Sequence, residues 1–172
     1  ILTERYSVFE IYLLSNLSHP FNGGILMKLN PDCMRIILKY CVEHIDYKDI
    51  GLNQWHENSV TLAMLYNSDE LKEFENKEIM YSVMKLYEYR FITVSKIQPT
   101  NGQQYFDSCE ITDVTVYGHD FYNSIQEDTI WNKTKNVVGQ VGNHTLKFIE
   151  DTAQKIAVES AKQAVSITMI QK

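Results

Sequence analysis

The sequence predicts an α+β fold that is mostly helical, namely a winged helix-turn-helix-like domain with a two-stranded wing, followed by an extra C-terminal helix. Three observations support this prediction. Helical patterns occur in three stretches before residue 90, a short apolar run separates the first two, and an Asn-Gly pair follows at Asn101 and Gly102. An Asn-Gly pair between alternating segments favours a tight hairpin turn. Helix, strand, helix, helix and hairpin, in that order, are typical of a winged helix.

The first helix is expected to open at Asn30-Pro31-Asp32. Asparagine is a good N-cap, proline suits the first helical position, and an acidic side chain favours the positive end of the helix dipole. Apolar residues at helical spacing then predict one buried face, and the helix is expected to end near Asp46. This face consists of Met34, Ile37, Leu38, Cys41 and Ile45.

Two further elements are expected between the first helix and Asn76. Residues 47–57 have no clear period and are interpreted as a loop, whereas the apolar run at residues 60–65 favours a strand. Residues 67–70 have the spacing of a capping box, which predicts a short second helix ending near Phe74.

A third helix, capped by Asn76 and running from Lys77 to Tyr89, would be the recognition helix of a winged helix. The wing would pair residues 91–97 with residues 105–111. A further helix is expected at residues 116–128, and Thr145 is expected to cap a last helix that ends near Met169. The predicted organisation is a leader or flexible extension at 1–26, a winged-helix-like domain at 27–135, a glycine-containing hinge at 136–144 and an amphipathic helix at 145–172.

Residues 1–26 allow two interpretations. Residues 23–27 can be encoded by codons that contain GGAGG, a bacterial ribosome-binding sequence, about seven nucleotides before an ATG, which would make this segment an untranslated leader read as protein. The alternative is a genuine turn at Asn22-Gly23-Gly24 after a short N-terminal helix. The predicted domain begins at Met27, which favours the first interpretation.

Composition excludes several classes of function. A formal net charge of −6 argues against non-specific nucleic-acid binding, although it is compatible with a local basic patch. The three cysteines form no C-x-x-C pair, so we expect reduced thiols in the cytoplasm. No apolar run is long enough to span a membrane. The absence of a Walker motif, a dinucleotide fingerprint or a nucleophile elbow predicts that no cofactor is bound and that the chain is not an enzyme.

Several segments resemble the domain-of-unknown-function family 2513. Residues 27–33 resemble the start of that family, residues 114–121 are similar to its I-T-W-E-G-H-E-F block, and residues 125–135 match the segment that follows. The stretch from Ile79 to Ile92 is similar to its third-helix block. The resemblance covers residues 27 to about 160, although Val116-Tyr117 stands where the family usually has Trp-Glu and residues 48–66 match poorly. It implies a phage or prophage context and no particular mechanism.

Gly118-His119-Asp120 invites a catalytic interpretation, because a histidine beside a carboxylate can act as a general base. We favour a structural one, in which Gly118 lets the helix pack closely, Phe121 fills the core, His119 bonds to the backbone or to a neighbour and Trp131 packs after the helix. A metal site formed by His44, Asp46, His56 and Glu57 has no standard ligand spacing, so no metal is expected.

The third helix and the wing are the expected binding elements, for either of two partners. As a DNA-binding regulator, the chain would use basic and amide side chains that can read bases. As a protein-interaction adaptor of the same fold, it would use exposed tyrosines. The candidate binding residues are Lys77, Tyr81, Lys85, Arg90, Lys96, Asn101, Gln103 and Gln104, and the tyrosines are Tyr81, Tyr87, Tyr89, Tyr105, Tyr117 and Tyr122.

The last helix carries a narrow stripe of small and branched residues, which would be unstable without a partner. The partner is expected to be either the helix's own domain or a second copy, and we favour a homodimer through this helix. Its heptads are interrupted and its charges are balanced, so neither a long coiled coil nor membrane binding is expected. The stripe consists of Ile149, Ala153, Ile156, Ala157, Ser160, Ala164 and Ile167.

Overall fold

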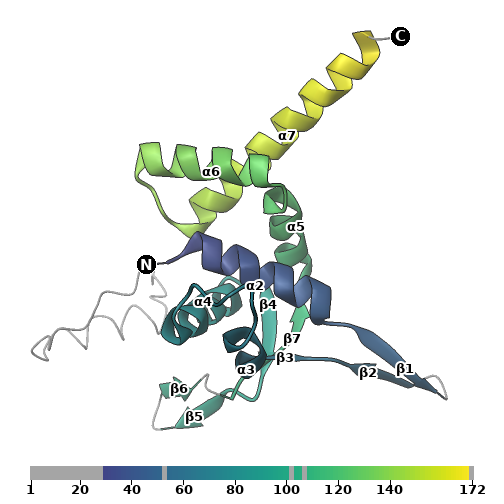
Figure 1. The fold of residues 1–172 in the computed structure, drawn as a ribbon, viewed down its shortest axis with the longest axis vertical. Coiled ribbons are helices and arrows are strands. Elements are labelled where there is room, and N and C mark those ends of the chain that lie inside the picture. The colour runs from purple at the N-terminus through teal and green to yellow at the C-terminus, as the bar shows by residue number, and fades with distance from the viewer. Residues whose placement is uncertain (1–28, 52–53, 101–102, 106–107, 171–172) are drawn as a thin grey trace, which may run out of the picture.

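The computed structural model describes residues 29–51, 54–100, 103–105 and 108–170 (Figure 1). This part contains six helices, a three-stranded antiparallel sheet and two two-stranded hairpins. The fold is therefore α+β and mostly helical, as the sequence predicts. The expected leader at residues 1–26 lies outside the described residues.

Helix α2 spans Pro31–His44 and lies across the middle of the molecule (Figure 1). The predicted cap is present, because the Asn30 side chain accepts hydrogen bonds from the backbone N–H groups of Asp32 and Cys33. The predicted apolar face is buried except at Ile45, which is half-buried. Helix α4, Asn76–Glu88, buries its own face against the same core. The buried residues of α4 are Ile79, Ser82, Val83 and Leu86.

The three-stranded sheet has the order β3-β7-β4, and all neighbours are antiparallel. Its strands are β3, Val60–Thr61; β4, Ile92–Ser95; and β7, Glu110–Val114. The last strand of the three along the chain thus lies in the centre. The inward-facing residues Val60, Ile92 and Ile111 bury their side chains in the core.

Two predictions for residues 47–66 are wrong. Residues 47–57, expected to be a loop, form a hairpin of β1, Tyr47–Gly51, and β2, Gln54–Glu57, which extends away from the end of α2 (Figure 1). The expected strand at residues 60–65 ends at Thr61, where helix α3, Leu62–Tyr66, begins. The Thr61 side chain caps this helix by accepting from Met64 N at 3.2 Å. A short apolar run is compatible with either element, and the cap decides for a helix.

The second helix predicted at residues 67–74 is replaced by turns. The side chains assigned to its cap close α3 instead. Asn67 Nδ2 donates to Ala63 O at 2.7 Å, and Ser68 Oγ donates to Leu65 O at 3.1 Å. Asn and Ser side chains can donate to the free carbonyls at a helix end as well as accept from the free amides at a helix start. The predicted cap of α4 is also off by one residue, because Glu75 is at the N-cap and Asn76 is the first helical residue.

The strands expected to form a wing are paired in two separate segments. The inner one pairs β4 with β7, and the outer one pairs β5, Gln98–Thr100, with β6, Gln103–Tyr105. Lys96 lies between β4 and β5 with a left-handed φ of 59°. The register pairs Thr100 with Gln103, which leaves two residues for the connection, as predicted. The conformation of the Asn-Gly pair itself lies outside the described residues.

Three helices follow the sheet: α5, Val116–Ile125; α6, Asp128–Val141; and α7, Leu146–Ile170. The single helix expected at residues 116–128 thus ends at Ile125. Most of the hinge expected at residues 136–144 is helical, because α6 continues through Gly139 to Val141 and ends at Gly142, whose φ is 73°. The predicted cap of α7 is present, since Thr145 Oγ1 accepts from Phe148 N at 3.3 Å.

Helix α7 has two unequal parts. Its first turns pack on α5 and α6, where Leu146, Ile149 and Ala153 are buried. Its second part extends beyond the body of the molecule (Figure 1). Ile149 and Ala153, expected to meet a second copy, therefore contact their own domain. In the rest of the predicted stripe, Ile156, Ala157 and Ser160 are half-buried and Ala164 is exposed, while the side chain of Ile167 lies outside the described part.

Candidate functional site

The predicted binding surface of α4 and the wing carries cations that are already paired. Lys77 Nζ lies 2.8 Å from Glu75 Oε2, Lys85 Nζ lies 2.6 Å from Glu88 Oε2, and Lys96 Nζ lies 2.5 Å from Glu110 Oε1. Lys85 also lies 5.2 Å from the centre of the Tyr81 ring. Because each lysine faces a carboxylate, this surface offers DNA phosphates little net positive charge. The side chains of Asn101, Gln103 and Gln104 lie outside the described residues.

The turn between α3 and α4 is acidic. Asp69, Glu70, Glu73 and Glu75 are exposed, and they are accompanied by one lysine, Lys72, which lies 3.8 Å from Asp69. This turn leads directly into the start of α4. A phosphate approaching the start of α4 would therefore meet carboxylates before it met the helix.

Arg90, the remaining predicted cation of this region, has a different environment. It follows α4 with a left-handed φ of 61°, a conformation that favours glycine. Arg90 N donates to Tyr87 O at 2.8 Å and Phe91 N donates to Leu86 O at 2.9 Å, which together form a Schellman cap. The side chain is exposed, and within the described residues its guanidinium forms no ion pair. An arginine here costs about 1 kcal/mol relative to glycine.

The start of α5 is held against this cap. Thr115 Oγ1 donates to Arg90 O at 2.6 Å, and Thr115 N donates to Phe91 O at 3.0 Å. Thr115 also caps α5, because its Oγ1 accepts from Gly118 N at 3.1 Å. As a result, the first residues of α5 lie beside the end of α4.

Large apolar side chains are exposed at this junction. Val116 is 74% exposed, Tyr117 is 66% exposed and Tyr89 is 42% exposed. The Tyr89 ring lies 6.1 Å from that of Phe91, centre to centre, so Tyr89 extends the core aromatics toward the surface. We call Tyr89, Arg90, Val116 and Tyr117 the junction surface. Tyrosine and arginine are among the side chains enriched at the energetic centres of protein interfaces.

Gly118 occupies a position where only glycine fits. A Cβ atom there would lie 2.0 Å from Phe91 O and 2.9 Å from a methyl group of Val114. One turn later, Phe121 is buried and stacks on Phe91 with ring centres 4.9 Å apart. The structural roles predicted for Gly118 and Phe121 thus agree with these contacts. The hydrogen bond expected for His119 is not found, because its side chain is exposed and no hydrogen bond to its imidazole occurs within the described residues.

Trp131 is buried and joins α6 to the start of α2. Its Nε1 donates to Asp32 Oδ1 at 2.6 Å, and Lys135 Nζ lies 2.9 Å from the same oxygen. Arg35 and Lys135 each lie 5.7 Å from the indole centre. Arg35 also donates to the carbonyls of Ile125 and Gln126, and it pairs with Asp128 at 2.8 Å. These polar groups satisfy one another and fix α6 on α2, so we assign this cluster a structural role.

The cysteines are buried thiols. Burial raises the pKa of Cys41 to about 12. Burial is also the main reason that the pKa of Cys33 rises to about 11, with a smaller contribution from the charge of Glu78. Thiols with raised pKa values are poor nucleophiles and poor metal ligands at neutral pH. Of the metal ligands considered from the sequence, His44 stacks on Tyr40 with ring centres 3.9 Å apart, and His56 and Glu57 have no described side chains. In the described part, no group of three or more His, Cys, Asp or Glu side chains lies close enough to hold a metal ion.

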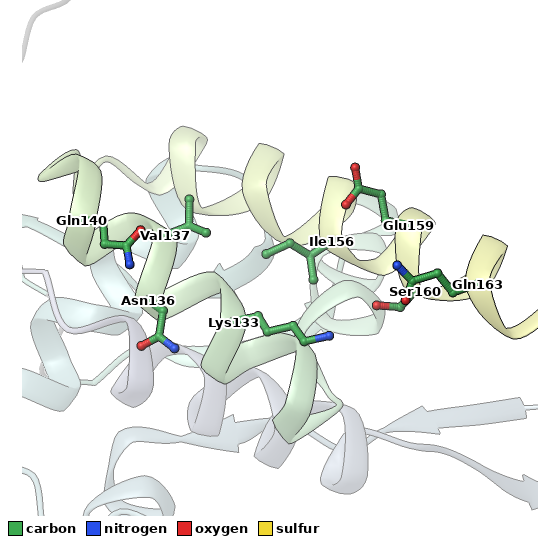
Figure 2. Close-up of a pocket in the computed structure, with 8 residues that line it drawn as sticks. All are labelled: Lys133, Asn136, Val137, Gln140, Ile156, Glu159, Ser160 and Gln163. Atoms are coloured by element: carbon green, nitrogen blue, oxygen red, sulfur yellow. The ribbon is translucent and has the colours of Figure 1, made fainter.

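A groove of about 330 Å³ lies between α6 and α7 (Figure 2). Its most apolar lining residues are Val137 from α6 and Ile156 from α7, and amide, hydroxyl and charged side chains line the rest. Neither the predicted DNA surface nor the junction surface contributes to it. The lining residues are Lys133, Asn136, Val137, Gln140, Ile156, Glu159, Ser160 and Gln163.

Residues 28–144 match the model of the family described as Hypothetical protein (DUF2513). The chain belongs to the DUF2513 family. The match begins close to the residue at which the resemblance was expected to start, and it ends between α6 and α7, before the expected limit near residue 160. No curated protein and no solved structure matches this DUF2513 chain. No helix in its described part is both long and apolar enough to cross a membrane.

Sequence reasoning named Tyr89 and Tyr117 of the DUF2513 chain in one set of tyrosines, and Arg90 among the candidate binding residues. It did not bring them together, because the contact depends on Thr115 reaching back across the sheet to Arg90. Val116 was missed as an interaction residue. One available signal was that Val116-Tyr117, at the start of a predicted helix, puts two large apolar side chains where the first turn of a helix is usually polar.

Proposed function

We propose that this DUF2513 chain is a winged-helix-type module that binds a protein partner through the junction surface. The proposal of a winged helix is supported by the order of α2, β3, α3, α4, β4 and β7, and by the central position of β7 in the sheet. The observation that carries the function is the exposed set of Tyr89, Val116 and Tyr117 around Arg90, whose guanidinium forms no ion pair in the part of the chain that the structure describes. Apolar anchors beside a cation suit a partner that offers an apolar side chain next to a carboxylate.

The test is a comparison of matched variants in affinity capture from lysate of the source cells. We expect a protein that the wild-type chain retains, that Tyr117→Ser and Arg90→Glu release, and that Lys77→Glu still retains. Lys77 is a suitable control because it is an exposed cation on α4 outside the junction surface. Equal capture by all four chains would contradict the proposal, as would loss of the partner only with Lys77→Glu.

A DNA-binding regulator is the second candidate, favoured by the exposed position of Lys77 and by the half-buried Tyr81 and Lys85 on α4. The paired lysines and the acidic turn make it the weaker one. Titration of the full chain into native-operon and random DNA at low salt tests it. Sequence-preferring binding that weakens with salt, and that Lys85→Ala and Lys96→Ala reduce, would favour this candidate over the first.

The proposal also includes self-association of two copies through α7, and a phage or prophage setting. The exposed second part of α7 supports the former, and the family resemblance suggests the latter. An operator-like repeat beside the gene would favour the DNA-binding candidate, and an adjacent partner gene would favour the adaptor. No catalytic step is proposed for His119, whose replacement by alanine should leave the folded chain intact because the side chain is exposed.

A further inference from the structure

The groove between α6 and α7 has the pattern of a helix-binding site. Both helices face it with residues at positions i, i+3, i+4 and i+7. On α6 these are 133, 136, 137 and 140, and on α7 they are 156, 159, 160 and 163. Side chains at this spacing form one face of a helix, so two such faces side by side provide a seat for another helix.

The second part of α7 is a helix that is only partly covered. No side chain from residue 154 to residue 166 is buried. From residue 156 to residue 170 the sequence contains two charged residues, Glu159 and Lys162. A helical extension with so few charges gains little from local ion pairs, and isolated helices of this length are marginal in water. Packing against another surface would stabilise it.

The charges of the groove indicate which surface that is. Lys133 stands on the α6 wall and Glu159 on the α7 wall, and neither forms an ion pair within the described residues. Figure 2 shows the two side chains on opposite sides of Ile156. In a two-fold symmetric contact the same surface meets itself, so each Lys133 can face Glu159 of the other copy, and the pairing occurs twice. A second copy of this chain therefore offers both a helix of the right kind and the missing counter-charges.

We infer that two copies associate with their α7 helices antiparallel, each seated in the α6–α7 groove of the other. The result is a bundle of four helices, α6 and α7 from each copy. Val137 and Ile156 form its apolar centre, and the Lys133–Glu159 pairs lie at its rim. This inference rests on the self-association included in the proposed function, but it is independent of what the junction surface binds.

Charge reversal in the full chain tests the inference, with the monomer–dimer equilibrium measured by sedimentation. We expect the wild-type chain to form a dimer at micromolar concentration. Lys133→Glu and Glu159→Lys should each weaken the dimer about ten-fold or more, because each variant turns both attractive pairs into repulsive ones. The double variant K133E/E159K should restore wild-type affinity. A mixture of the two single variants should form heterodimers more tightly than either variant associates with itself.

Lys162→Glu is the matched control, because it makes the same charge change on the exposed part of α7 outside the groove. It should leave the dimer unchanged, and circular dichroism should show that all variants are folded. A wild-type chain that stays monomeric would overturn both this inference and the self-association proposed above. A dimer that is insensitive to the single reversals, or that the double variant does not restore, would overturn the groove contact and leave self-association by another surface.

Discussion

Gly118→Ala should destabilise the chain strongly, even though it adds a single methyl group. That methyl group would lie 2.0 Å from Phe91 O and 2.9 Å from a Val114 methyl group, so the backbone of α5 has to move away from the sheet. Overpacking of this kind costs about 1–3 kcal/mol. The movement also strains the hydrogen bonds from Thr115 to Arg90 O and Phe91 O, which contribute about 0.5–1.5 kcal/mol each. The better helix propensity of alanine returns up to about 1 kcal/mol.

The expected net loss is therefore about 2–4 kcal/mol in the free energy of unfolding, which lowers Tm by roughly 4–16 °C for a chain of this size. Gly139→Ala is the matched control, because Gly139 is also in a helix and a Cβ atom there would have nothing within 4 Å. It should stabilise the chain by about 0.5–1 kcal/mol. Urea unfolding monitored by circular dichroism measures both changes. A Gly118→Ala chain as stable as the Gly139→Ala chain would refute the close contact with Phe91 O.

Three further changes have defined outcomes. Arg90→Gly should raise the free energy of unfolding by about 0.5–1 kcal/mol, because glycine adopts the left-handed conformation freely; a loss of stability in urea unfolding would mean that the arginine side chain supports the fold. Trp131→Phe should lower the free energy of unfolding by about 1.5–3 kcal/mol, because the hydrogen bond to Asp32 is lost. A change within about 0.5 kcal/mol would argue against that bond. Alkaline pH should destabilise the chain, because folding raises the pKa of Cys33 from 9.0 to about 11 and that of Cys41 from 9.0 to about 12. The contribution of these neutral thiols to the free energy of unfolding is complete below pH 9 and is lost as the pH rises toward the raised pKa values. Replacing Cys41 with alanine should reduce that alkaline loss, and an unchanged pH profile would contradict this assignment.

The elements that sequence alone predicted well are those in which a capping residue and an apolar face at helical spacing both indicate the same helix. Asn30 opens α2 and Thr145 opens α7, and in both helices apolar residues follow at helical spacing. Thr115, Gly118 and Phe121 also have the roles expected of them, because a cap, a close approach and a core aromatic are local requirements that their spacing expresses. Consistent local signals of this kind identify an element without knowledge of its neighbours.

The errors occur where one signal has two structural meanings. Asn67 and Ser68 have the spacing of a helix start, yet their side chains end α3, and only the chain before them decides between the two. Gly139 suggested a hinge, but an exposed glycine within a helix costs only about 1 kcal/mol, which the buried Trp131 and Val138 of the same helix offset. The apolar stripe of α7 was recognised from the sequence. Which of its residues pack on the chain's own domain and which extend beyond it depends on where α6 ends, and the sequence did not show that.

The cluster around Trp131 provides an optical probe of the molecule. An indole that is buried, bonded to a carboxylate and flanked by Arg35 and Lys135 has an emission spectrum different from that of an indole in water. The sequence contains one other tryptophan, Trp55, so the Trp55→Phe chain would emit from this site alone. Its fluorescence would then follow the detachment of α6 from α2 and distinguish it from the melting of the sheet.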